Sequence, residues 1–133
     1  MSLRDDLIAE EGIRLKPYLC PAGKTTIGVG RNLDDVGITE AEAMAMLDND
    51  ISRVNAQLAK ALPWFKGSSA SIRRALGNMC FQLGINGLLK FQKMLAALQG
   101  RDYNTARREA LDSAWAKQTP QRANRVVLLF TEQ

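Results

Sequence analysis

The sequence predicts an α+β protein, mostly helical, in which a small β-hairpin lobe and a helical lobe are joined by one long helix. Three observations support this prediction. A turn-rich segment with β-branched residues lies at 14–29, a continuous helical pattern follows at 39–62, and apolar residues then recur at helical spacing to the end of the chain. A chain of 133 residues with 46% hydrophobic residues suits one compact domain.

The first helix is predicted to end near Glu11. Leu3, Leu7 and Ile8 share one helical face, and Gly12 suits the residue that follows a helix C-terminus.

A β-hairpin is predicted next, between Arg14 and Val29. Pro21-Ala22-Gly23 supplies turn chemistry, and the β-branched run Thr25-Thr26-Ile27 favours a returning strand. Pro17 confines the first strand to an edge of the sheet or to a bulge.

The long helix is predicted to begin at a capping box made by Thr39 and Glu42. Its apolar residues recur at steps of three or four: Met44, Leu47, Ile51, Val54, Leu58 and Leu62. Pro63 ends it. Helix geometry makes such a segment roughly 34 Å long, which suits a connection between two lobes.

The rest of the chain is predicted to be helical, with a last helix capped by Thr119 and opened by Pro120. The expected division of the single domain is a small β lobe at 12–38, a connecting helix at 39–62, and a helical lobe made of 1–11 plus 63–133.

The amino-acid composition limits the kinds of active site that the chain can contain. The net charge of +4 favours an anionic partner. The sequence contains no histidine, which excludes histidine triads and histidine metal sites, and Cys20 and Cys80 form no CxxC pair, so no metal and no cofactor is expected. No apolar run is longer than Val126–Phe130, which is far too short to cross a bilayer, and no secretory leader is predicted.

Acid–base chemistry must then rest on carboxylates or a thiol, and Glu11 is the first candidate. At a helix C-terminus the partial negative charge of the helix favours the protonated form of a carboxyl group, as a general acid requires. A glutamate there is more often an ordinary surface residue. Cys20 and Thr26, in the hairpin, are the residues that a β turn can bring back toward this helix end.

Three separated stretches carry a resemblance to a known family. They are residues 10–18 with Gly23 and 26–30, residues 78–84, and residues 115–126. Together they resemble the phage-type lysozymes, the endolysins of glycoside hydrolase family 24. The family motif is Glu, eight residues, Asp or Cys, five residues, Thr, and Glu11, Cys20 and Thr26 match it without a gap. The resemblance implies a two-lobed lysozyme-like fold.

It also implies hydrolysis of the β-1,4 bond between N-acetylmuramic acid and N-acetylglucosamine in peptidoglycan. Glu11 would protonate the glycosidic oxygen, with Cys20 and Thr26 assisting the attacking water, or with Cys20 itself as the nucleophile. A neutral thiol is a poor base, whereas a thiolate is a good nucleophile, so both an inverting and a retaining outcome stay open.

The resemblance also implies roles for other residues, at the positions that match the family. Phe81 and Gln82 match a stretch that lines the sugar cleft, although a core position for Phe81 is an equal alternative. Arg122 matches an arginine that pairs with the catalytic glutamate, and Gln118 and Arg125 flank it. A solvated basic helix face is the alternative for Arg122 and Arg125. Arg31 stands where the family often has histidine, and we expect it to pair with Asp50 on the long helix.

The implied partners are peptidoglycan glycan strands, with a monomeric enzyme that neither binds nucleic acid nor inserts into a membrane. The family further implies a cytolytic, antimicrobial role, residence in the host cytoplasm before lysis, and release to the periplasm or cell wall with a holin as functional partner. A catalytically impaired peptidoglycan-binding domain and a lytic transglycosylase are the alternatives. A nucleic-acid binder is disfavoured, because Trp115 is the lone aromatic residue before Arg122 and Arg125.

Overall fold

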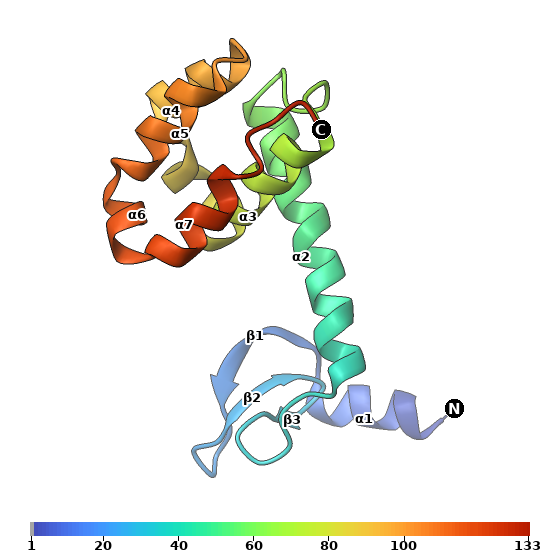
Figure 1. The fold of residues 1–133 in the computed structure, drawn as a ribbon. Coiled ribbons are helices and arrows are strands. Elements are labelled where there is room, and N and C mark those ends of the chain that lie inside the picture. The colour runs from blue at the N-terminus through green and yellow to red at the C-terminus, as the bar shows by residue number, and fades with distance from the viewer. Residues whose placement is uncertain (1) are drawn as a thin grey trace. The chain divides into compact units, whose positions relative to one another are not determined.

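The computed structural model describes residues 2–133, and these form helices α1–α7 and a three-stranded sheet (Figure 1). Contacts between Cα atoms divide the chain into two compact units, one ending at Met46 and the other running Leu47–Gln133. The protein is therefore α+β and mostly helical, as predicted.

The first unit contains one short helix and the whole sheet. Its elements are α1 (Leu3–Glu11), β1 (Arg14–Leu19), β2 (Thr25–Gly28) and β3 (Arg31–Asn32). The strand order is β1-β2-β3 and both pairings are antiparallel. The hairpin formed by β1 and β2 was predicted, but β3 was not. Two residues with no β-branched side chain give no strand signal, and Arg31 and Asn32 become a strand only by pairing with Ile27 and Thr26.

Helix α1 is bounded as the sequence predicts. The Ser2 side chain accepts a hydrogen bond from the Asp5 N–H, and Gly12 ends the helix with a φ of 71° while its N–H donates to the Ile8 carbonyl at 2.8 Å. The placement of residues 1–11 in the helical lobe was wrong, because α1 groups with the sheet. Only Gly12 and Ile13 separate it from β1.

The irregularity that Pro17 was expected to impose is present in β1. This strand lies at an edge of the sheet, and its register with β2 shifts between Arg14 and Tyr18. The turn that follows closes with the Gly23 N–H donating to the Cys20 carbonyl at 2.8 Å.

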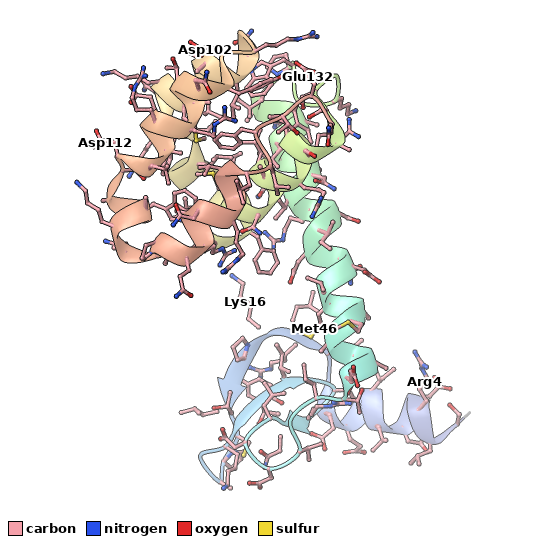
Figure 2. The ribbon with its side chains drawn as sticks, viewed as in Figure 1. Arg4, Lys16, Met46, Asp102, Asp112 and Glu132 are labelled. Carbon is pink, nitrogen blue, oxygen red and sulfur yellow. The ribbon has the colours of Figure 1, made fainter. Side chains whose placement is uncertain are left out.

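Helix α2 (Glu40–Ala61) begins at the predicted capping box. The Thr39 N–H donates to Glu42 Oε1 at 2.8 Å, and the Glu42 N–H donates to Thr39 Oγ1 at 3.1 Å. The division between the two units falls inside this helix, just after Met46, which Figure 2 labels.

The second unit holds the apolar core. Its helices are α3 (Ala70–Leu89), α4 (Gln92–Gln99), α5 (Tyr103–Leu111), α6 (Ala114–Gln118) and α7 (Pro120–Val127), together with the second part of α2. The largest fully buried side chains are Phe130, Leu58, Ile72, Leu76, Met79, Leu88, Met94, Val126 and Cys80. A core of this kind stabilises the unit through removal of apolar surface from water.

Two details of the helical unit depart from expectation. Helix α3 is kinked at Gly84, which has a φ of 75°. Thr119 precedes α7, but its hydroxyl donates back to the Trp115 carbonyl at 2.9 Å instead of accepting from the first turn of α7. The predicted side-chain cap was wrong, because α6 ends immediately before Thr119 and its free carbonyl competes for the hydroxyl.

The two units differ in charge. The first contains 5 basic and 8 acidic residues, and the second contains 13 basic and 6 acidic residues, so their net charges are −3 and +7. Within residues 2–133, no helix has the length and apolar character that a bilayer crossing requires.

Candidate active site

Glu11 is the last residue of α1, and its side chain is exposed. Its carboxyl group lies directly on the backbone of Gly30, in the turn between β2 and β3. An ideal Cβ at position 30 would be 2.8 Å from Cδ and Oε2 of Glu11 and 2.9 Å from Cγ. The Glu11 carboxyl group at the end of α1 therefore lies against the turn between β2 and β3, at Gly30, which has no side chain.

Cys20 is half-buried at the start of the hairpin turn. Its N–H donates to the Lys24 carbonyl at 3.0 Å. Hydrogen bonds from the backbone of Lys24 first, and then from the backbone of Ala22 and the side chain of Thr26, lower the pKa of the Cys20 thiol, although partial burial opposes them. The turn thus stabilises the thiolate, which is the nucleophilic form of cysteine.

Thr26 is the buried polar residue of the site, with 3% of its surface exposed. It lies in β2, opposite Tyr18 on one side and Asn32 on the other. Its hydroxyl donates to the Lys24 carbonyl at 2.9 Å. Because the Lys24 carbonyl also accepts the Cys20 backbone N–H, Cys20 and the Thr26 hydroxyl are held at the same carbonyl of the turn.

The first unit therefore contains a carboxyl group at a helix end, and a thiol and a hydroxyl at one hairpin turn. A carboxyl group can donate a proton, a thiolate can attack an electrophilic carbon, and a hydroxyl can orient water or the thiolate. These three groups all belong to the first unit.

Arg31 does not pair with Asp50, and this prediction was wrong. Its guanidinium binds Glu42 at two points, Nη1–Oε1 and Nη2–Oε2, each at 2.6 Å, and Nη1 also donates to the Gly37 carbonyl at 3.2 Å. Asp50 pairs with Arg53 at 3.1 Å instead. Glu42 is in the first turn of α2, whereas Asp50 is eight residues, or about 12 Å, further along the helix.

Arg122 belongs to the second unit, on α7. Its Nε donates to Asn78 Oδ1 at 2.9 Å and its Nη2 donates to the Asn78 carbonyl at 3.2 Å, which ties α7 to α3. Gln118 and Arg125 are exposed. The pairing of Arg122 with Glu11 stays a prediction.

Phe81 is half-exposed, at 50%, so the alternative of a core position is wrong. It lines a groove of about 760 Å³ on the second unit, between α2 and α3. The groove has an apolar floor that includes Leu47, Ile51 and Val54, and its cationic residues are Lys66, Arg73, Arg74 and Arg122. The role of Phe81 in sugar binding stays a prediction.

Gln82 is held by the helical core. Its Oε1 accepts a hydrogen bond from the indole N–H of Trp115 at 2.9 Å, and the Trp115 ring meets Phe91 edge-on with centroids 6.0 Å apart. The substrate role predicted for Gln82 is untested, but its side chain is oriented by a buried partner.

Reasoning from the sequence did not identify three contributors to these sites. Lys24 and Ala22 act through their backbone, which no side-chain pattern reveals. Asn78 lies within a stretch that resembles the family, but an exposed asparagine carries no signal of its own. The contact of Gly30 with Glu11 was not predicted either, although a glycine at the end of a strand is a signal for close approach of another group.

Comparison with known proteins decides the family. The model of the phage lysozyme family matches residues 9–128. The chain belongs to the phage lysozyme family. That range contains the candidate active site and the whole helical unit except its last five residues, so both parts of this phage lysozyme family member are covered.

Several relatives support a lysozyme-like function. The pre-baseplate central spike protein Gp5 of Enterobacteria phage T4 is 30% identical over 98% of this chain and 28% of its own length. The probable T4-type lysozyme 2 of Dictyostelium discoideum is 28% identical over 97% of this chain and 93% of its own length. An endolysin of Acyrthosiphon pisum secondary endosymbiont phage 1 is 48% identical over 36% of this chain and 35% of its own length.

The chain spans less than a third of the length of the spike protein and nearly all of the Dictyostelium protein. Both of these alignments run over 158 positions, although the chain has 133 residues, so at least 25 positions of each relative have no counterpart here. This member of the family is therefore shorter than these relatives within the matched region.

Proposed function

We propose that this chain hydrolyses the β-1,4 bond between N-acetylmuramic acid and N-acetylglucosamine in bacterial peptidoglycan, with Glu11 as general acid, Cys20 as nucleophile at the sugar carbon and Thr26 assisting Cys20. The observation that carries the proposal is that Cys20 and the Thr26 hydroxyl share the Lys24 carbonyl at the hairpin turn, in the same unit as Glu11. Family membership and the names of the relatives support the lysozyme assignment.

The lowered thiol pKa favours Cys20 as a nucleophile over Cys20 as a base. In the first step the thiolate forms a bond to C1 of the muramic acid residue while the C1–O bond breaks, and the Glu11 carboxyl proton passes to the departing oxygen. In the second step Glu11, now a carboxylate, takes a proton from water, the water oxygen binds C1, and the C–S bond breaks to restore the thiolate. Two displacements at C1 retain its configuration.

Thr26 supports this route by its position beside Cys20 at the hairpin turn. Its side chain is among the groups that lower the thiol pKa, and it is itself fixed by the Lys24 carbonyl. The net charge of +7 on the helical unit is suited to an anionic cell-wall polymer. We propose the glycan strands as the partner of a monomeric enzyme, and release from the host cytoplasm to the wall as its route to the substrate.

The test is hydrolysis of purified peptidoglycan by the natural chain, Glu11→Gln and Cys20→Ser, with analysis of the released sugars. We expect a loss of about 10²–10⁴-fold in kcat for Glu11→Gln, reducing ends without anhydro sugar, and retention at C1. Equal rates for the natural chain and Glu11→Gln would overturn the role of Glu11. An anhydro product would indicate a lytic transglycosylase instead.

Analysis of the anomeric configuration of the products from the natural chain, Cys20→Asp and Cys20→Ser separates the two possible stereochemical courses. Inverted product from the natural chain, together with full rate in Cys20→Ser, would contradict the nucleophilic role and assign Cys20 and Thr26 to positioning of water. Binding of peptidoglycan without any cleavage would support the alternative of an impaired binding domain.

A further inference from the structure

The backbone of Gly30 lies against the Glu11 side chain. We propose that Gly30 is a positioning residue for the Glu11 carboxyl group. The proposal rests on the function proposed above. The absence of a side chain at position 30 lets the carboxyl group lie on the backbone, in the place from which it would donate its proton.

The distances support this directly. Three atoms of the Glu11 side chain, Cγ, Cδ and Oε2, are 2.8–2.9 Å from the point where a Cβ of residue 30 would be. Nonbonded heavy atoms pack at about 3.5–4.0 Å. The observed position of the carboxyl group is therefore incompatible with any residue other than glycine at position 30.

The other glycines with a positive φ show that this contact is not a general consequence of the backbone. Gly30 has a φ of 66°, in the left-handed region that favours glycine, but five further glycines share that property. For these five, an added Cβ would meet no heavy atom within 4 Å: Gly12, Gly23, Gly28, Gly37 and Gly84. At those positions backbone conformation alone favours glycine, whereas at position 30 the contact with Glu11 is an additional reason.

The sheet holds the backbone of this turn in place. Gly30 precedes β3, and Arg31, the next residue, pairs with Ile27 of β2 and binds Glu42 at the start of α2. The group that must yield to a Cβ is instead the end of a flexible side chain, which rotates away at little cost in packing. Gly30→Ala should therefore move the carboxyl group while the fold persists.

Gly28 supplies the matched control. It has a φ of 70°, it lies two residues away, and a Cβ there meets nothing within 4 Å. Gly28→Ala and Gly30→Ala thus share the strain of a left-handed alanine, of similar size in both variants. Only Gly30→Ala displaces Glu11.

The experiment compares the natural chain, Gly30→Ala and Gly28→Ala. The readouts are the thermal midpoint, kcat and KM on peptidoglycan, and the carboxyl ¹³C resonance of Glu11. We expect similar losses of thermal stability in both variants. In Gly30→Ala alone we expect kcat to fall about 100-fold, as for a misplaced catalytic group, with little change in KM, and the Glu11 resonance to shift.

An equal kcat in the two glycine variants, or an unshifted Glu11 resonance in Gly30→Ala, would overturn the proposal. If Gly30→Ala does not fold while Gly28→Ala does, the double variant Glu11→Ala/Gly30→Ala decides. Removal of the three contacting atoms should then restore folding, and failure to do so would contradict the contact. Glu11→Gln separates the two proposals. If that variant keeps its rate, the proposed function fails, while the resonance still tests the positioning.

Discussion

Arg31 and Glu42 form a two-point ion pair, with both N–O distances at 2.6 Å, that joins β3 to the first turn of α2. Glu42 also closes the capping box with Thr39, so one carboxylate accepts from a guanidinium and from a helix N-terminus. The Arg31 hydrogen bond first, and then those from Thr39, lower the pKa of Glu42 to about 2.

This pair makes the stability of the first unit depend on pH. A carboxyl group whose pKa is lower in the folded state contributes stability above its unfolded value, here 4.5, and loses that contribution as the pH falls toward 2. Arg31→Ala should therefore lower the thermal midpoint at pH 7 and have little effect at pH 2. Arg53→Ala, which breaks an exposed pair with Asp50, should have a smaller effect at pH 7. An effect of Arg31→Ala that is equal at both pH values would contradict this account.

The two cysteines should differ in reactivity. Hydrogen bonds lower the pKa of the half-buried Cys20 thiol, whereas burial raises the pKa of the Cys80 thiol, which is 2% exposed in the core. In the native protein at pH 7.5, iodoacetamide should alkylate Cys20 at least tenfold faster than Cys80, because rate follows thiolate fraction and access. Peptide mass mapping over time measures both rates in one sample. Comparable rates would show that the turn does not activate Cys20.

We expect the Ser69 side chain to stabilise the last residues of the chain. Its Oγ accepts from the Ile72 N–H at 3.1 Å, as the cap of α3, and donates to the Thr131 carbonyl at 2.5 Å. Ser69→Ala should lower the free energy of unfolding by about 1–2 kcal/mol and speed amide exchange in the last residues, which include Glu132 (Figure 2).

Ser113→Ala is the matched control for Ser69→Ala. Ser113 caps α6, but its hydroxyl donates to the nearby Ala110 carbonyl, so its loss should leave exchange at the chain end unchanged. Ser69→Thr keeps both hydrogen bonds and should stay close to the natural stability. Rapid exchange at the chain end in Ser69→Thr would argue against the contact with Thr131.

The Trp115–Gln82 hydrogen bond should be measurable as a coupling energy. Trp115 is 5% exposed, so Trp115→Ala should destabilise the protein by about 3–5 kcal/mol, and Trp115→Phe, which removes the N–H but keeps a ring, by about 1–2 kcal/mol. Gln82→Met removes the acceptor. In a denaturant-based double-mutant cycle, Trp115→Phe and Gln82→Met should be non-additive by at least 0.5 kcal/mol. Strict additivity would mean that the bond contributes nothing.

The sequence by itself determined where several helices and the hairpin turn begin or end. It also indicated the family. Gly12, Pro63 and the Thr39–Glu42 capping box bound α1 and α2 where predicted, and Pro21-Ala22-Gly23 makes the hairpin turn. These signals act over a few residues, so their outcome depends little on the rest of the molecule. The Glu11, Cys20 and Thr26 spacing likewise indicated the family that the comparison then established.

Only the tertiary structure decided which groups meet. It gave Arg31 the carboxylate of Glu42 in place of Asp50, grouped α1 with the sheet, and directed the Thr119 hydroxyl to Trp115. It also placed the Glu11 carboxyl group on Gly30. Each of these outcomes depends on the distance between two groups that are not adjacent in the sequence. Several side chains of the same charge or polarity could serve as the partner, and the fold decides which of them lies within reach.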